Sequence, residues 1–134
     1  LTDPYMSRKE FRDEIAAGVE FWGYEVHEAL RGVMGIQRSQ DVVLIRHAYT
    51  GTEYQGEGIG AGLLKFLLAK TSRPVLIGTW AGLTRTINFY ESHGFSLVPQ
   101  QAIAPLLRKY WAVPDSQIEN SVVLANVSPD ELSY

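Results

Sequence analysis

The chain has 134 residues, of which 46% are hydrophobic and 20% are charged, a composition typical of a single globular domain with its own core. Its net charge of -3 argues against a nucleic-acid-binding protein, because neutralising phosphates requires a surplus of Lys and Arg. The absence of cysteine excludes disulfides, thiolate catalysis and thiolate metal sites, and we expect no metal. No apolar run approaches the ~20 residues that span a bilayer, so we expect no membrane partner.

The first part of the chain predicts a helix followed by antiparallel strands. Residues 6–18 have the pattern of a short amphipathic helix. Aromatic and β-branched residues then predict a hairpin of strands 20–26 and 31–38, joined by a turn at 27–30. A short connection leads into residues 41–50, the most strand-like stretch of the chain. Strands with such short connections pair antiparallel.

The second part of the chain alternates helices and strands. The expected helices and strands are, in order, helix 58–72, strand 74–80, helix 82–94, strand 95–99, helix 102–113 and strand 117–127. Strand–helix–strand units imply right-handed crossovers and parallel pairing. Together with the antiparallel strands before them, these elements predict an α/β fold whose mixed central sheet is flanked by helices.

A glycine-rich segment, YQGEGIGAGLL from Tyr54 to Leu64, holds four of the twelve glycines and opens the first of these later helices. A helix N-terminus presents N–H groups without partners and a partial positive charge, and together they bind phosphates. Glycines let these N–H groups approach an anion, because they carry no Cβ. The residues alone leave two interpretations open, a phosphate-binding loop or a tight turn between a strand and a helix.

Two familiar phosphate motifs do not fit this segment. The NAD-binding fingerprint requires an acidic residue about 20 positions after the glycines. No Asp or Glu stands between Glu57 and Glu91. The same interval carries four basic residues, Lys65, Lys70, Arg73 and Arg85. A P-loop is excluded because no Gly-Lys-Ser/Thr follows. A basic, acid-free interval suits a ligand with several phosphates.

Two ordered motifs stand in this region, QGEGIG at residues 55–60 and INFYESHGF at residues 87–95. They resemble those of the GNAT superfamily of acyl-CoA-dependent N-acetyltransferases. The first matches the family signature Gln/Arg-x-x-Gly-x-Gly/Ala, and the second is similar to the second family motif. The likeness runs in outline from Glu20 to Val98 and is specific from residue 42 to 95. It implies a GNAT-like fold, with a parallel pair of strands splayed in the middle of the mixed sheet.

The resemblance implies acetyl-CoA as a co-substrate whose pyrophosphate is held by backbone N–H groups of the glycine loop. The loop residues that match the motif are Gln55, Gly56, Glu57, Gly58, Ile59 and Gly60. The pantetheine arm would lie along the strand 42–50, beside strand 75–80. The backbone near Ala48, Tyr49 and Thr50 would hold the arm and polarise the thioester carbonyl. One donor in such an oxyanion-type arrangement can contribute ~3 kcal/mol.

The resemblance implies a catalytic role for one tyrosine, whereas the residue that acts as general base stays open. Tyr90 matches the tyrosine that in many relatives protonates the departing thiolate of coenzyme A, and its alternative role is a core residue of an amphipathic helix. An acceptor amine must lose a proton before it attacks, and His47 is the titratable candidate on the central strand. A structural histidine is the alternative. Further candidates for the base are His27, His93 and a water chain to Glu25 or Glu53.

Some positions depart from the family pattern. Leu83 and Thr86 stand where the family commonly has Asn and Ala, and Glu57 stands where many relatives carry Lys or Arg. The central strand has no acidic residue after Asp41. The family's first strand and helix have no counterpart before Met6, so either they were removed or this member is short. We otherwise expect one acyltransferase-like domain over residues 1–134.

The leading expectation is an N-acetyltransferase that moves an acetyl group from acetyl-CoA to a primary amine by direct attack in a ternary complex. The alternative is an inactive acyl-CoA-binding sensor with the same fold. The acceptor is a small-molecule or peptide amine, and a homodimer stays open. We expect a cytoplasmic location, with which the absence of cysteine is compatible.

The acceptor pocket is the part of the site that the motifs do not cover. Aromatic residues that would suit it, or would equally suit core packing, are Trp22, Tyr24, Trp80, Tyr110 and Trp111. Arg108 and Lys109 would either bind an anionic acceptor group or lie on a solvated helix face.

Overall fold

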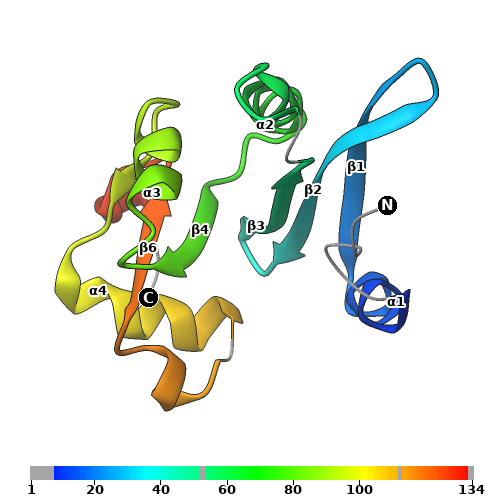
Figure 1. Cartoon of the computed structure of the whole chain (residues 1–134). Coiled ribbons are helices and arrows are strands. Elements are labelled where there is room, and N and C mark those ends of the chain that lie inside the picture. Colours follow the sequence, from blue (N-terminus) through cyan, green and yellow to red (C-terminus); the bar gives the residue numbers. More distant parts are fainter. Residues whose placement is uncertain (1–7, 52–53, 112, 133–134) are drawn as a thin grey trace. The chain divides into compact units, whose positions relative to one another are not determined.

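The structure, a computed structural model, describes residues 8–51, 54–111 and 113–132. Its main elements are α1 (Arg8–Ala16), β1 (Val19–Val26), β2 (Ala29–Ser39), β3 (Val42–Thr50), α2 (Ile59–Leu68), β4 (Val75–Trp80), α3 (Thr84–Glu91), β5 (Ser96–Leu97), α4 (Gln100–Leu106) and β6 (Ser121–Ala125). The strands form a mixed sheet with a parallel pair, in the order β1-β2-β3-β4-β6-β5 (Figure 1). The predicted α/β fold with a mixed sheet is confirmed.

The chain divides into two compact units. The first comprises Leu1–Arg38 and Ile45–Ser72, and the second Ser39–Leu44 and Arg73–Tyr134. The strand β3 therefore contributes its first three residues to the second unit and the rest to the first. In the part of the chain that the structure describes, no helix has both the length and the apolar surface needed to cross a membrane.

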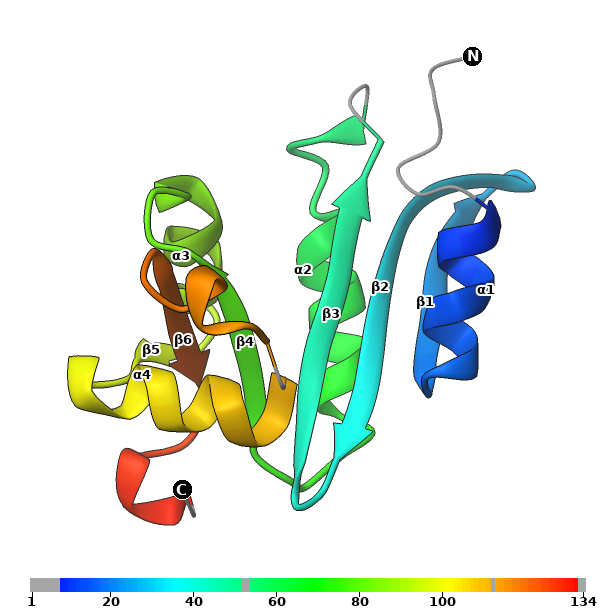
Figure 2. The same cartoon turned by 90° about the horizontal axis from the view of Figure 1, so that it is seen from below.

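The first unit is built on the antiparallel hairpin of β1 and β2. Val26 pairs with Ala29, so the turn consists of His27 and Glu28 alone, with φ angles of 51° and 65°. This turn is shorter than the predicted one, because two left-handed residues suffice to reverse the chain. Helices α1 and α2 both contact β1 and cover opposite faces of the hairpin (Figures 1 and 2).

Helix α2 buries one apolar face in the first unit. Its buried residues are Ile59, Leu63, Leu64 and Leu67. Their spacing is that of one helical face, as the sequence predicts. Because Ile59 is the first residue of the helix, the buried face begins directly at the end of the glycine loop. Packing of this face therefore anchors the N-terminus of the helix, where the loop N–H groups lie.

The second unit is built on β4, β6 and β5. Leu76 of β4 and Ser96 of β5 both pair antiparallel with the same residue, Ala125 of β6. The strands joined by α3 are thus not direct neighbours, since the last strand of the chain lies between them. Helices α3 and α4 lie on opposite faces of these strands (Figures 1 and 2). Val43, at the start of β3, donates a backbone hydrogen bond of 2.9 Å to Pro74, just before β4.

Helix α4 is shorter than the predicted helix 102–113. It ends at Leu106 and continues as a π-helical turn over Leu107–Trp111. Pro105 lies inside α4, where it cannot donate a backbone hydrogen bond. The buried side of this segment belongs to the core of the second unit, with Ala102, Ile103, Leu106, Leu107 and Tyr110 packed among residues of β3, β4 and β6.

Candidate functional site

The glycine loop adopts a backbone that L side chains avoid. Gly56 and Gly58 have φ angles of 89° and 79°. A Cβ built on either of them would meet no atom within 4 Å in the described structure. The two glycines are therefore required by backbone conformation and not by lack of space. Thr52 and Glu53, which precede the loop, lie outside the described residues, and with them one of the predicted alternatives for the base.

The loop ends at the N-terminus of α2 without a side-chain cap. Gly58 is the N-cap, and the first helical turn contains no acidic residue. The first intrahelical bond runs from the N–H of Gly62 to the carbonyl of Gly58, over 2.9 Å. The N–H groups of residues 59–61 thus have no acceptor within the helix. Such a terminus favours a negative charge, which the helix dipole attracts.

Arg31 reaches the loop from β2, and sequence reasoning missed it. Its backbone carbonyl accepts a hydrogen bond of 2.9 Å from Gly51, and its guanidinium carbon lies 4.5 Å from the ring centroid of Tyr54. Its Nη1 lies 3.5 Å from Oε1 of Glu57. Glu57, the acidic residue of the glycine loop, thus has a cation beside it. The Arg31 Nε is buried without a hydrogen-bond partner among the described residues.

The end of β3 is the more accessible half of that strand. Residues 42–45 are buried, whereas Ala48 is exposed and Tyr49 and Thr50 are half-buried. The Gln55 side chain donates a hydrogen bond of 3.5 Å to the carbonyl of Thr50, which ties the loop back to the strand. The structure thus brings the predicted residues Ala48, Tyr49 and Thr50 next to the predicted loop within one unit.

His47 packs against α1 and β1. Its Nε2 lies 3.4 Å from Oε2 of Glu14, and its ring stacks on Phe21 with centroids 5.9 Å apart. These contacts are what a structural histidine would make, and the role of a general base stays a prediction. The weaker candidates are placed elsewhere: His27 and Glu25 lie exposed at the tip of the hairpin, and Nδ1 of His93 lies 2.7 Å from the carbonyl of Phe89.

Tyr90 belongs to the second unit and is buried on α3, with 3% of its surface exposed. Its ring contacts Phe89 and Phe95 at centroid distances of 5.0 and 5.6 Å. Its role as a general acid stays a prediction. Leu83, at the N-cap of α3, gives that helix no side-chain cap and is exposed. The described residues include no group of three or more His, Cys, Asp or Glu placed to hold a metal ion.

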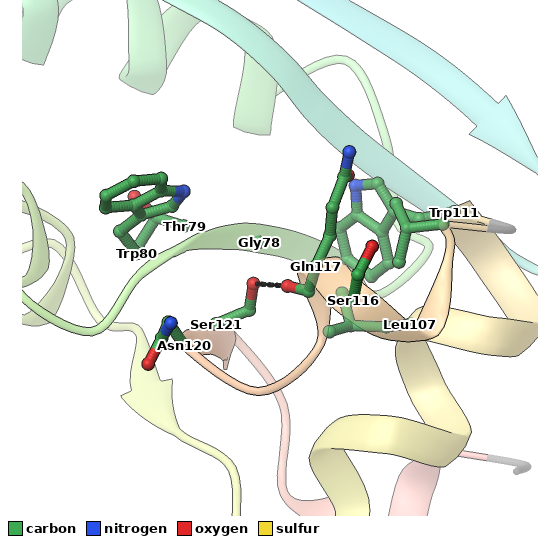
Figure 3. A pocket seen from close by; sticks show the side chains of 10 residues that line it. Gly78, Thr79, Trp80, Leu107, Trp111, Ser116, Gln117, Asn120 and Ser121 are labelled. Atoms are coloured by element: carbon green, nitrogen blue, oxygen red, sulfur yellow. Dashed lines mark hydrogen bonds between the residues drawn. The ribbon is translucent and has the colours of Figure 1, made fainter.

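A pocket with a volume of about 420 Å³ opens in the second unit (Figure 3). Its lining residues are Gly78, Thr79, Trp80, Leu107, Trp111, Val113, Ser116, Gln117, Asn120 and Ser121. Of the five aromatic residues predicted for an acceptor pocket, Trp80 and Trp111 line it. Trp22 packs instead against Phe66 in the first unit, with ring centroids 5.2 Å apart. Tyr24 also belongs to that unit.

The remaining predicted pocket residues serve other contacts of the second unit. Tyr110 donates a hydrogen bond of 2.7 Å to Oδ1 of Asp41. Burial, together with this carboxylate, raises the pKa of Tyr110 to about 12, and the same hydrogen bond lowers the pKa of Asp41. Arg108 lies 3.3 Å from the carboxylate of Asp115, and the Lys109 ammonium lies over the Tyr110 ring. Neither cation lines the pocket.

Comparisons with solved structures find the same fold at low sequence identity. A structure of a GNAT family acetyltransferase from Elizabethkingia anophelis with acetyl-CoA bound is 19% identical, has a TM-score of 0.65 and matches over 87% of this chain and 80% of its own. The ribosomal-protein-S18-alanine N-acetyltransferase of Escherichia coli is 16% identical, with a TM-score of 0.67 and coverage of 96% and 83%. Arabidopsis thaliana Naa50, solved with a bisubstrate analogue, is 20% identical, with a TM-score of 0.63 and coverage of 96% and 85%.

These solved structures share the fold at low identity, and a comparison with curated protein sequences finds no significant match. The family is shown by the sequence itself. The family model described as an acetyltransferase (GNAT) domain matches residues 17–97, which span β1 to β5 and include the glycine loop. This match covers more than half of the chain, and the chain therefore belongs to the GNAT acetyltransferase family.

Proposed function

We propose that the protein is an N-acetyltransferase that transfers the acetyl group of acetyl-CoA to a primary amine. The observation that carries the proposal is the glycine loop, whose left-handed backbone leads into an uncapped helix N-terminus within the region that matches the family. The N–H groups of residues 59–61 have no acceptor within α2, and together with the dipole of this helix they would favour a pyrophosphate. The guanidinium of Arg31 lies beside the loop, with Nη1 3.5 Å from Oε1 of Glu57, and adds positive charge near this terminus.

The residues that we propose for cofactor binding fall into two groups. The backbone of residues 55–60 would hold the pyrophosphate, and the accessible end of β3 at Ala48, Tyr49 and Thr50 would hold the pantetheine arm. Acetyl-CoA, when bound, supplies a thioester, which is an activated acyl group. Donors fixed in advance at the thioester oxygen would stabilise the negative charge that develops there during attack.

The proposed route is direct attack of the amine on the thioester in a ternary complex. With no cysteine in the sequence, a cysteine acyl-enzyme is excluded. The C–N bond forms, the C–S bond breaks, and the thiolate takes up a proton, for which Tyr90 is the proposed donor. The amine must first lose a proton, and His47 is the proposed base. The acceptor is an amine of a small molecule or a peptide.

A second candidate function is an acyl-CoA-binding sensor without catalysis. The observations that favour it are the absence of a carboxylate on β3 after Asp41 and the exposed Leu83 in place of the common asparagine. The sensor keeps the loop and its contacts, so cofactor binding is common to both candidates.

Thermal unfolding with acetyl-CoA tests the cofactor site. A ligand at a hundred times its dissociation constant stabilises a protein by ~2.7 kcal/mol, which for a chain of this size raises Tm by about 10 °C. An unchanged Tm at millimolar acetyl-CoA would contradict both candidates. Release of free coenzyme A over a panel of primary amines then separates them, because a sensor is stabilised and releases none.

A further inference from the structure

We propose that the pocket of the second unit binds the body of the acceptor amine and selects an uncharged aromatic group there. This inference rests on the proposed function, because an acceptor is needed only if the protein transfers an acetyl group. The pocket nevertheless binds such a group by its own contacts, so its occupancy can be measured without turnover.

The pocket lies at the carboxyl end of β4, where Gly78, Thr79 and Trp80 line it. In α/β sheets, ligands bind outside the carboxyl ends of the strands. On the other side, the π-helical turn supplies Leu107 and Trp111. Turns of this kind are rare and are found frequently at functional sites. The volume of about 420 Å³ falls within the range of pockets for small ligands.

The shape of the pocket depends on glycine at position 78, which has no side chain. A Cβ on Gly78 would stand 3.3 Å from the indole of Trp111 and 3.5 Å from Cδ2 of Leu107. Because glycine occupies this position, the indole can lie directly over β4. Trp111 thus forms a half-buried wall of the pocket.

The second indole of the pocket, that of Trp80, is exposed to solvent. Trp80 is 69% exposed, the most exposed of the large hydrophobic side chains in the described structure. The two indoles lie on opposite sides of the lining in Figure 3. Exposed tryptophan is characteristic of binding sites, because its large flat surface binds a partner with little loss of side-chain entropy. An aromatic group of an acceptor would cover it.

The lining contains no charged residue, and no histidine, among its ten described members. Its polar groups are hydroxyls and amides, of which the Ser121 hydroxyl already donates to the Gln117 carbonyl over 2.6 Å. A carboxylate or a second ammonium group would lose its water here without gaining a counter-ion. The same absence of cations makes the pocket unsuitable for the phosphates of a cofactor. An aromatic ring that carries a hydroxyl or an indole N–H matches both the indoles and the amides.

The test compares tyramine and tryptamine with glutamate and spermidine as acceptors. We expect kcat/KM at least about tenfold higher for the two aromatic amines. Trp80→Ala should raise KM for tyramine about tenfold while kcat and the dissociation constant of acetyl-CoA stay nearly constant. Because Trp80 is exposed, this variant should fold. Trp111→Phe is a second variant of the pocket lining for the same measurement. The matched control is Phe66→Ala, which truncates an exposed aromatic residue of α2 in the first unit and should leave KM for tyramine unchanged.

A titration with tyramine, followed by NMR of the three indole N–H signals, measures the pocket without turnover. The Trp80 and Trp111 signals should shift, and the Trp22 signal should not. If these shifts occur but no amine is acetylated, the proposed function is contradicted, while binding of an aromatic amine in the pocket is supported. If the signals do not shift, or if Trp80→Ala weakens acetyl-CoA instead of tyramine, the inference is overturned.

Discussion

At the scale of single residues, the glycines of the loop can be predicted from the sequence, whereas the contact of the loop with Arg31 cannot. The motif identifies the loop from Gln55 to Gly60, and the left-handed φ angles of Gly56 and Gly58 agree with the need for glycine there. Arg31 is separated from Glu57 by 26 positions, and only the folded chain brings the two together. No local pattern around Arg31 distinguishes it from any other cation on a strand.

Glu57 should oppose the binding of a pyrophosphate. Glu57→Gln is expected to lower the dissociation constant of acetyl-CoA roughly threefold to tenfold, because it removes a negative charge beside the loop and releases Arg31. Isothermal titration calorimetry at low salt measures the change, and 0.5 M NaCl should reduce it. Glu20→Gln, which removes an exposed acid from β1, is the control. Weaker binding by the Glu57 variant would show that the Arg31–Glu57 pair shapes the loop instead.

Tyr90 differs from a core phenylalanine by its hydroxyl alone. Tyr90→Phe should keep the ring contacts with Phe89 and Phe95 and lower kcat at least about tenfold, as expected when a general acid is lost. Steady-state release of coenzyme A measures kcat, and Tm reports whether the variant is folded. Unchanged turnover in a folded variant would remove Tyr90 from the mechanism.

At the scale of the elements, sequence patterns predict type and order well and boundaries less well. The strand with continuous apolar residues and the helix that follows the glycines appear close to where they are predicted, as β4 and α2. The predicted helix 102–113 becomes α4 and a π-helical turn, because an apolar period does not report the hydrogen-bond pattern of the backbone. The hairpin turn is two residues long, and neither His27 nor Glu28 has the sequence signature of such a turn.

The hairpin turn is therefore a point of stored strain. Both central residues adopt left-handed backbone, which costs an L residue roughly 1–2 kcal/mol, and Asn-Gly is the preferred pair for this turn. The double variant His27→Asn, Glu28→Gly should raise the free energy of unfolding by about 1 kcal/mol, corresponding to about 3–5 °C in Tm. Thermal unfolding followed by circular dichroism measures this. A lower Tm would mean that the turn is not strained.

At the scale of the whole molecule, the sequence predicts the fold class but not the order of all strands. The position of β6 between β4 and β5 depends on pairing between residues far apart in the chain, which local periodicity does not contain. The same holds for the pocket of the second unit. Trp80 and Trp111 are recognisable as aromatic candidates, whereas Gln117 and Asn120 become lining residues only through the fold.

Stability of the molecule should depend on pH through Tyr110 and Asp41. The folded pKa of Tyr110 is raised to about 12, so its stabilising contribution is complete below pH 10 and is lost as pH rises from 10 towards 12. The pKa of Asp41 is lowered from its ordinary value of 3.8, so its contribution is present above that pH and is lost below it. Tyr110→Phe should lower Tm at pH 7.

The Tyr110→Phe variant should also flatten both ends of the pH profile. Urea unfolding between pH 2.5 and 11.5 measures the free energy of unfolding for both proteins. The difference between them should be largest between pH 5 and pH 9 and should shrink toward either extreme. A difference that does not vary with pH would show that the loss does not arise from the ionisable pair of Tyr110 and Asp41.

The exposure of Trp80 also has a spectroscopic consequence. An indole in water emits at longer wavelength than one that is covered, so Trp80 dominates the red side of the emission, while Trp22 and Trp111 are half-buried. Any molecule that covers the pocket should shift this emission to the blue, and a Trp80→Phe protein should lose most of that response, since only the half-buried Trp111 remains in the lining. The emission wavelength of Trp80 thus reports whether the pocket is covered. Acceptors can therefore be screened without a label and before any activity is measured.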